Sequence, residues 1–345
     1  MKKIFITMVL CLTLFSSLFT VHVFADDTVY TLIVSNHAAE KSAMNRAVLN
    51  VLEKATELSD GRLQFEVYAD GTLASAGAAL SAVQTGTCDI AVLNSGSLGS
   101  DMALSTVFAL PGIWEDWRDG SKAYQAMYAD ESSAFRQAMD GLGVHLFANM
   151  SFGGVAFASK TEITSLNQLD GLRAIVTDSA RADILSQLGA IPVSMNNADS
   201  FEAISKGTAD IACNLSMTGL ISNGITDVAK YVYVLKDSVM GLTTMPLAIN
   251  QGVYDNLPED LQAIFDNLWT EYIIDYVYES QIIDTSAFDR FISEMDGTVN
   301  YATEEDNELY RELGKETWQT WCDSYDAQGI EASRCLEEYL TYLAK

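Results

Sequence analysis

The stretch LSAVQTGTCDIA at residues 80–91 returns in altered form as FEAISKGTADIA at residues 201–212. Both copies have apolar residues at helical spacing, then a glycine (Gly86 or Gly207), and then an aspartate followed by a short apolar run. A helix that stops at a glycine and leads into a buried strand is a common α/β unit. The repeat therefore predicts two similar α/β halves within one chain.

The first half opens with a β-α-β pattern. Residues 29–34 are strand-like, and within residues 44–58 the apolar positions recur every three or four residues, which places them on one face of a helix. Gly61 is placed to end that helix. Residues 63–67 then alternate between apolar and polar, as in a half-buried strand. This order of elements indicates an α/β lobe.

A long helical pattern begins at Pro258 and continues to about Met295, with no glycine before Gly297. Proline is favoured as the first residue of a helix. At about 1.5 Å per residue, such a helix would reach roughly 50 Å, which is longer than a small domain is wide. We therefore expect it to pack on both halves. Two helices that break near Ser280 or Thr285 are the alternative.

The connection between the two halves carries no linker signal. No Pro/Ser-rich or low-complexity segment separates them, and the whole chain has only 4 prolines. We expect the halves to be joined by strands that cross from one to the other. A few residues at the ends of such strands can absorb the rotation of two lobes that close on a ligand.

The first 25 residues have the zones of a secretory signal peptide. Lys2 and Lys3 precede an apolar run at residues 4–15, and Val-Phe-Ala at residues 23–25 precedes Asp26. The run is shorter than the roughly 20 apolar residues that span a membrane. We therefore expect cleavage after Ala25 and a periplasmic protein.

The charge balance is strongly acidic, with 47 Asp and Glu against 20 Lys and Arg and a net charge of −27. Binding to nucleic acid relies on Lys and Arg that neutralise phosphates. Nucleic acid is therefore excluded as an expected partner. The acidic surface is expected to keep the protein soluble.

Few residues could carry metal or nucleophilic chemistry. Only His37 and His145 follow the signal segment, and HxxxH, CxxC and GxSxG spacings are absent from the sequence. No metal site, cofactor or catalytic triad is expected. His145 stands in a strand-like apolar run at residues 143–147 and is interpreted as a structural histidine.

Four cysteines follow the signal segment. Cys322 and Cys335 flank a turn-like stretch at residues 325–329, and an oxidising compartment permits a disulfide between them. The sequence leaves that bridge open. Cys88 and Cys213 lie in apolar runs, where they are expected to be small buried side chains.

Polar residues stand at the ends of several expected strands. Asn36 and His37 follow the first strand, and Asn94 and Asn214 end the strands of the two repeat copies. Ligands of open α/β sheets collect at the carboxyl ends of the strands. These residues are therefore expected to face one cleft, with a simple role in turns as the alternative.

Short motifs along nearly the whole chain after the signal segment resemble the solute-binding proteins of tripartite ATP-independent periplasmic (TRAP) transporters. In the first half they are Gly61-Arg62, Gly71-Thr72-Leu73, residues 83–87, residues 89–91 and Leu110-Pro111-Gly112-Ile113-Trp114. In the second half they are residues 169–173, 188–195, 203–207, 210–214 and 257–260.

The resemblance implies an α/β, two-lobe periplasmic-binding-protein-like fold with crossing strands, a central ligand cleft and a long helix that spans both lobes. Residues 26–150 plus about 241–280 would form lobe I, and residues 151–240 plus about 281–345 would form lobe II. The chain would be a monomer without cofactor or catalysis. It would trap a small organic solute by lobe closure and deliver it to the small and large membrane subunits of a TRAP permease.

The chain departs from the family pattern where the ligand is held. The two arginines that typically bind a ligand carboxylate in this family fall on Val155 and Ile175, and hydrocarbon cannot replace their charge-assisted bonds. The resemblance therefore leaves a ligand without a carboxylate open. Arg173 and Arg181 are nearby residues that could substitute for the missing arginines.

Other pocket positions of the family also differ, and Asn214 is the one that is retained. The family's first-lobe glutamate becomes Ala78, a second glutamate becomes Cys213, and an aromatic position becomes Asn197. The residues expected to line the cleft stand at strand ends or in the loops that follow. Besides Val155, Ile175 and the two substitute arginines, they are Asn36, His37, Asn94, Trp114, Phe152, Asn197 and Asn214.

Two alternative functions would use the same cleft. A secreted enzyme could use His37 as a general base, and its turnover would then depend on that residue. A sensory binding protein would pass its signal to a receptor in place of a permease. The motif pattern favours transport over both.

Overall fold

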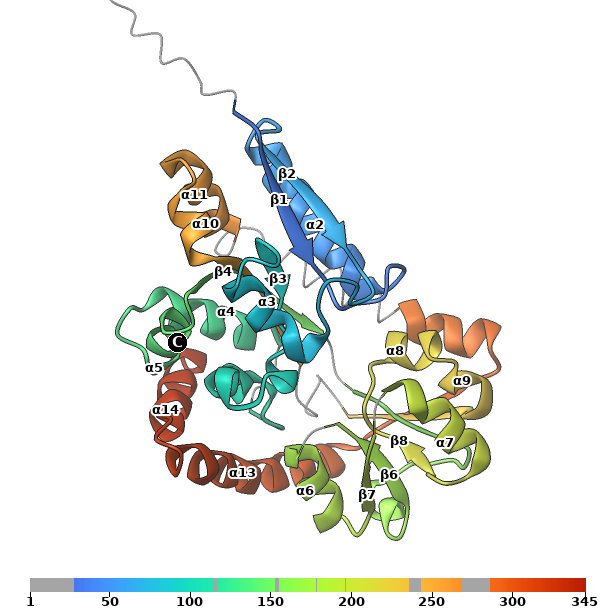
Figure 1. Cartoon of the computed structure of the whole chain (residues 1–345). Helices are drawn as coiled ribbons and strands as arrows, with labels where there is room; N and C mark the ends of the chain where they lie inside the picture. Colours follow the sequence, from blue (N-terminus) through green and yellow to red (C-terminus); the bar gives the residue numbers. More distant parts are fainter. Residues whose placement is uncertain are drawn as a thin grey trace, which may run out of the picture.

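The computed structural model describes residues 28–113, 117–152, 155–177, 179–195, 197–235, 243–268 and 286–345. The expected signal segment therefore lies outside the described residues. Within the described part, no helix is both long and apolar enough to cross a membrane. The chain forms two α/β lobes, each built on its own sheet (Figure 1).

The first sheet has the strand order β2-β1-β3-β10-β4. Strands β1, β2 and β3 run parallel, and β10 is antiparallel to both of its neighbours. The strands are β1 (Tyr30–Ser35), β2 (Leu63–Tyr68), β3 (Ile90–Val92), β4 (Val144–Phe152) and β10 (Thr243–Asn250).

The second sheet has the order β11-β9-β5-β8-β6-β7. Strands β6, β7 and β8 are parallel, and β5 is antiparallel to β8 and β9. The strands are β5 (Phe157–Ser159), β6 (Arg173–Val176), β7 (Ile191–Ser194), β8 (Ile211–Ala212), β9 (Tyr231–Val234) and β11 (Thr298–Tyr301). In each sheet, one antiparallel strand lies next to the strand of the repeat unit: β10 lies beside β3, and β5 lies beside β8.

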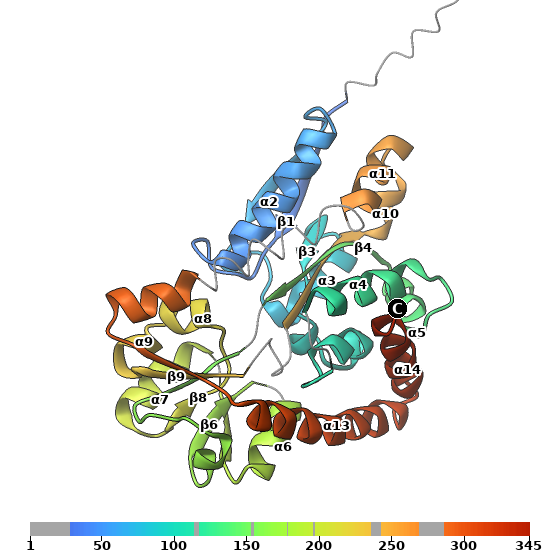
Figure 2. The ribbon, with the colours of Figure 1, turned by 180° about the vertical axis from the view of Figure 1, so that it is seen from behind.

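Helices cover the sheets of both lobes (Figures 1 and 2). On the first lobe they are α2 (Ala43–Leu58), α3 (Ala79–Gln84), α4 (Trp117–Ala129), α5 (Ala134–Asp140), α10 (Gln251–Asp255) and α11 (Glu259–Asn267). On the second they are α6 (Ser179–Gln187), α7 (Ser200–Lys206), α8 (Met217–Ser222) and α9 (Ile225–Val228). Two more follow β11, namely α13 (Glu304–Asp326) and α14 (Ala332–Leu343). Short 3-10 turns add η1 (Ala76–Ala78), η2 (Ser95–Ser97), η3 (Gly99–Ala109), η4 (Leu166–Leu169) and η5 (Asn197–Asp199).

The repeat read from the sequence is confirmed as a repeat of structure. Helix α3 ends before Gly86 and helix α7 before Gly207, and these glycines have φ of 74° and 70°, which favours a residue without a side chain. The aspartates that follow also match. Asp89 accepts a hydrogen bond from the Ile33 backbone at 2.8 Å, and Asp210 accepts one from the Arg173 backbone at 2.9 Å. Each aspartate thus fixes its strand beside the neighbouring strand.

The expected crossing strands are also present. The chain passes from the first sheet to the second between β4 and β5, and it returns between β9 and β10. It then reaches the second sheet again at β11. Because β4 and β10 are antiparallel neighbours over most of their length, both passages leave the first lobe side by side. The lobes are therefore connected where a hinge would bend.

Helix α13 packs on both lobes along the lower edge of the molecule in Figure 1. Thr303 caps its start, and Asp306 in its first turn is buried in the second lobe. The Asp306 carboxylate accepts hydrogen bonds from the Tyr233 hydroxyl at 2.5 Å and from the Leu166 backbone at 3.3 Å. Tyr310 continues this contact as part of the second lobe's core. The first half of α13 therefore belongs to the second lobe.

The second half of α13 lies against the first lobe. The Trp318 indole donates to the Pro111 carbonyl at 2.8 Å, and the Trp321 indole donates to the Thr106 hydroxyl at 2.9 Å. A side chain at Gly314 would overlap the Pro111 carbonyl, so only glycine lets the helix approach this turn. Helix α13 is thus the helix of the described chain that ties the two lobes together.

The expected long helix from Pro258 is only partly testable. Pro258 precedes α11 as its N-cap, and a second helical segment covers residues 286–294. Residues 269–285 lie outside the described part of the chain. The expected helix over residues 258–295 therefore stays a prediction. Within the described residues, α13 is a helix that packs on both lobes.

The C-terminal helix corrects the expected lobe boundaries. Helix α14 falls within residues 281–345, which we assigned to lobe II, yet it packs on α4, α5 and η3 of the first lobe. Cys335 and Tyr339 are fully buried in the first lobe's core. The reason is that α13 carries the chain back across the junction before α14 begins.

The four cysteines of the described chain are free and buried. The bridge considered between Cys322 and Cys335 is not formed in the structure. Burial raises the pKa of the Cys322 and Cys335 thiols above the ordinary value, which disfavours the thiolate that begins disulfide exchange.

We predict that Gly314→Ala destabilises the protein by about 1–3 kcal/mol, because the added methyl group overlaps the Pro111 carbonyl. Urea denaturation followed by circular dichroism measures this change. Ser324→Ala, at an exposed position of the same helix, is the matched control and should change stability by less than about 0.5 kcal/mol. Equal stabilities of Gly314→Ala and the control would contradict the close contact.

Candidate functional site

The first lobe presents Asn36 directly after β1. Its side chain is fully buried, donates to Asn45 at 2.9 Å and accepts from the Ala38 backbone at 2.9 Å. Both ends of the amide are thus occupied within the protein. Asn36 shapes the loop at the end of β1, and this matches the turn role that the sequence left open.

His37 follows in the same loop and bridges two neighbouring strands. Its Nδ1 lies 3.3 Å from the Val92 carbonyl at the end of β3, and because a carbonyl only accepts, Nδ1 must carry the proton. Burial lowers the pKa of His37 below its ordinary value, so the ring is neutral near pH 7. Its Nε2 is then an acceptor, and it is buried without a hydrogen-bond partner among the described residues.

Asn94 ends the strand of the first repeat copy. Its side-chain oxygen accepts from the Ser97 backbone at 3.2 Å and so caps η2. The residue is half-buried, close in sequence to Val92, the strand end that His37 contacts. The carboxyl ends of β1 and β3 therefore bring His37 and Asn94 to the same edge of the sheet.

The second lobe places Asn214 in the equivalent position after β8. The side-chain nitrogen donates to the Asn197 side chain at 2.7 Å and to the Ser200 hydroxyl at 3.1 Å. Both amide hydrogens are used, so the orientation of the amide is set. Its oxygen is buried and has no hydrogen-bond partner in the described chain. Asn197 and Asn214 thus lie in contact, and Asn197 itself is exposed.

Ser200 is a functional neighbour that sequence reasoning missed. It is the first residue of α7, it is fully buried, and it orients Asn214. The only signal in the sequence was its place after Asp199 at the start of a helix, where serine usually serves as a cap.

Val155 and Ile175, on which we expected the family's arginines to fall, are both buried. Ile175 is fully enclosed in the core between the second sheet and helices α7, α8 and α9. Val155 forms a bridge with Ser216 at the point where the chain enters the second lobe. Neither side chain can donate a hydrogen bond, so no charged group is supplied from these two positions.

Arg173 does not reach the carboxyl ends of the strands. It is the first residue of β6, and its guanidinium holds the Asp210 carboxylate through two bonds of 2.8 Å. It also donates to the Gly207 carbonyl at 2.7 Å. Arg173 therefore stabilises the turn at the amino end of the strands, away from the expected cleft.

Arg181 lies at the opposite end of the same unit. It is the third residue of α6, and only 6% of its surface is exposed. Its guanidinium donates to the Cys213 carbonyl at 2.9 Å. Cys213 directly precedes Asn214, so Arg181 is held at the carboxyl end of β8. Of the two substitute arginines, this is the one that the structure brings to Asn214.

The side chains of the two remaining predicted site residues, Trp114 and Phe152, cannot be placed in the site. Trp114 lies outside the described residues, and Phe152 ends β4 with a side chain that is not described.

In the described ranges, no group of three or more His, Cys, Asp or Glu side chains could hold a metal ion.

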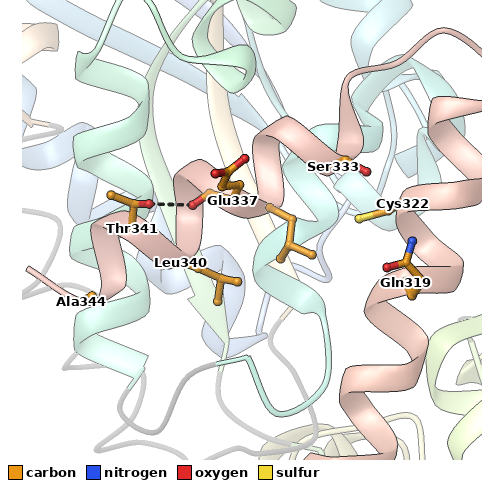
Figure 3. Close-up of a pocket in the computed structure, with 8 residues that line it drawn as sticks. Gln319, Cys322, Ser333, Glu337, Leu340, Thr341 and Ala344 are labelled. Carbon is orange, nitrogen blue, oxygen red and sulfur yellow. Dashed lines mark hydrogen bonds between the residues drawn. The ribbon is translucent and has the colours of Figure 1, made fainter.

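A groove of about 610 Å³ lies between α13 and α14, apart from the strand ends (Figure 3). Leu336, Leu340 and Cys322 contribute its apolar lining, and Glu337 and Thr341 contribute polar groups. The Thr341 hydroxyl donates to the Glu337 carbonyl within the helix at 2.9 Å. The groove contains none of the residues predicted to bind the ligand.

His145 is confirmed as a structural histidine. Its Nε2 lies 3.0 Å from the Asp266 carboxylate, and its ring stacks on Tyr254 with 4.0 Å between centroids. These contacts join β4 to the helices α10 and α11 of the first lobe. Among the described residues, His37 is therefore the histidine that lies at the carboxyl ends of the strands.

We predict that His37 makes the folded protein less stable as the pH falls, because its buried ring resists protonation. Its pKa is lowered in the folded state, so the unfolded chain takes up the proton first, and stability is lost from about pH 6.5 down to the folded pKa. The melting temperature of the wild type should therefore drop more between pH 7 and pH 5 than that of His37→Gln. His145 is present in both proteins, so the difference between their profiles reports on His37. Identical pH profiles would contradict a buried neutral His37.

Comparisons with known proteins agree with this architecture. Residues 34–324 match the model of the bacterial extracellular solute-binding protein family 7. A solute-binding protein of Albidiferax ferrireducens is 23% identical over 217 residues, which cover 63% of each chain. The chain thus spans somewhat less than two thirds of that relative.

Solved structures show the same fold at low identity. A TRAP solute-binding protein of Rhodoferax ferrireducens, in complex with copurified benzoate, has a TM-score of 0.79 at 22% identity and covers 92% of this chain and 98% of its own. A Bordetella pertussis extracytoplasmic solute receptor that binds pyroglutamic acid has a TM-score of 0.74 at 16% identity, with coverage of 90% and 99%. The expected two-lobe periplasmic-binding-protein fold is confirmed, and the chain belongs to the bacterial extracellular solute-binding protein family 7.

Proposed function

We propose that this chain is the periplasmic subunit of a TRAP transporter that captures a small organic solute. The observation that carries the proposal is the placement of polar residues at the carboxyl ends of both sheets, with His37 on the first lobe and Asn214 on the second. Each has a buried acceptor atom without a partner in the described chain. A solute enclosed between the lobes would supply the missing donors.

Lobe closure is supported by the connections between the lobes. The two sheets are joined by adjacent crossings, and α13 is anchored to the second lobe through Asp306 and to the first through Trp318. A few residues at these crossings can absorb a rotation while the packed lobes stay intact. Closure would remove the solute from water and strengthen its hydrogen bonds.

The proposed partners follow from the family. Family members are periplasmic, and we propose export through the signal segment with cleavage after Ala25. The loaded protein would deliver its solute as a monomer to the small and large membrane subunits of the permease. Binding without catalysis is the proposed activity, and His37 then serves as a hydrogen-bond acceptor.

We predict that native mass spectrometry of the purified protein detects a copurified small molecule, because an enclosed site releases its ligand slowly. The ligand-free protein should gain about 2.7 kcal/mol of stability when this molecule is added at 100 times its Kd. A thermal-shift series measures the gain. The proposal fails if no molecule copurifies and no member of a broad panel of acids, amines and neutral metabolites raises the melting temperature.

A further inference from the structure

Helix α14 carries apolar residues on two faces. The inner face packs on the first lobe, where Cys335 and Tyr339 are fully buried. An outer row of Leu336, Leu340 and Ala344 recurs every four residues and lines the groove between α13 and α14 (Figure 3). Leu336 is half-buried, whereas 38% of Leu340 is exposed. Because a surface helix needs a single apolar face to pack on its own protein, the outer row indicates a second contact.

The length of the groove indicates the kind of occupant. Its lining on α14 runs from Ser333 to Ala344, which is roughly 16 Å or three helical turns at about 1.5 Å per residue. Gln319 and Cys322 of α13 form the facing side. A small metabolite would cover only part of this length. An amphipathic helix can lay its apolar side chains along all of it, which is a common mode of peptide recognition.

The charges around the groove are mainly negative. Residues 316–344, which include all of its lining residues, contain six Asp and Glu and a single cation, Arg334. Glu337 lines the groove, and Glu316 lies one turn from Gln319 on the same face of α13. Neither glutamate forms an ion pair within the described part of the chain. The groove thus has carboxylates at its rim that its own protein does not neutralise.

The cations beside the groove cannot supply this neutralisation, because each has a partner of its own. The pairs are Arg334 with Glu331 and Glu338, Lys315 with Glu312, and Lys345 with the Tyr342 ring. The complementary surface is therefore a helix whose apolar stripe is flanked by Lys or Arg. An anionic membrane surface would bring further negative charge to the groove, and so would a second copy of this chain, whose net charge is −27.

We propose that the groove between α13 and α14 binds a basic amphipathic helix of a partner protein. Apolar side chains of that helix lie on Leu336 and Leu340, and its Lys or Arg side chains reach Glu337 and Glu316. The groove lies apart from the strand ends and contains none of the residues predicted to bind the ligand. The interaction is therefore independent of the proposed capture of a solute.

Three fluorescein-labelled peptides of about 18 residues, long enough to cover the groove, provide the probes. The first has leucines at helical spacing on one face and lysines elsewhere. The second has the same composition with the leucines scattered, and the third has glutamates in place of the lysines. We expect the first to bind the purified protein at least tenfold more tightly than the others, measured by fluorescence anisotropy at physiological salt. Equal binding of the first and second peptides overturns the proposal, because charge alone then accounts for it. Tighter binding of the third overturns it as well.

Single substitutions locate the peptide on the protein. Leu340→Ser should lower the affinity for the first peptide about tenfold, because an apolar contact is lost. Leu309→Ser is the matched control, at a leucine of α13 that is 36% exposed and outside the groove. Glu337→Gln should lower the affinity about threefold, and Glu308→Gln, also exposed on α13, should not change it. Unchanged binding by Leu340→Ser, or an equal loss in Leu309→Ser, would place the peptide elsewhere and overturn the proposal.

Two further measurements test the other occupants. Sedimentation velocity of the protein alone should show one species at all concentrations. Flotation with phosphatidylglycerol vesicles should leave the protein in the soluble fraction. Self-association that Leu340→Ser abolishes would assign the groove to a second copy of the chain, and vesicle binding that it abolishes would assign the groove to a membrane surface. Either result overturns the proposal.

Discussion

The contact between helix α13 and the Pro111 turn is the constraint on which the arrangement of the lobes depends. Gly314 lets the helix backbone approach the Pro111 carbonyl, and Trp318 donates to the same oxygen. Earlier in the same helix, Tyr310 and Asp306 are buried in the second lobe. One helix therefore contacts both lobes along one edge, and the crossings between the sheets are the place where we propose that the lobes rotate.

We propose that the solute is enclosed between the carboxyl ends of the strands of the two sheets. Two copies of one α/β unit bring Asn94 and Asn214 to equivalent positions, and each is oriented by a neighbour in its own lobe. The chemistry differs between the copies because the second has Arg181 beside its asparagine. A solute held between the lobes would thus meet the buried acceptor atoms of His37 on one side and of Asn214 on the other.

Much of the fold could be predicted from the sequence because glycine stops, apolar periodicity and the doubled aspartate are local signals. Residues 80–91 and 201–212 contain the whole unit, and the structure confirms it. The places of α13 and α14 could not be predicted in this way. Both depend on contacts between residues far apart in the chain, such as Gly314 with Pro111, and on which lobe offers the better core for Tyr339.

The site was less predictable for the same reason. From their sequence positions alone, Arg173 and Arg181 were equally good candidates, and only their partners Asp210 and Cys213 in the structure distinguish them.

The central claim is that the two lobes close on a solute. Small-angle X-ray scattering, before and after removal of the copurified ligand, tests this most directly. We predict a smaller radius of gyration for the loaded protein, and identical scattering profiles from loaded and empty protein would contradict the account.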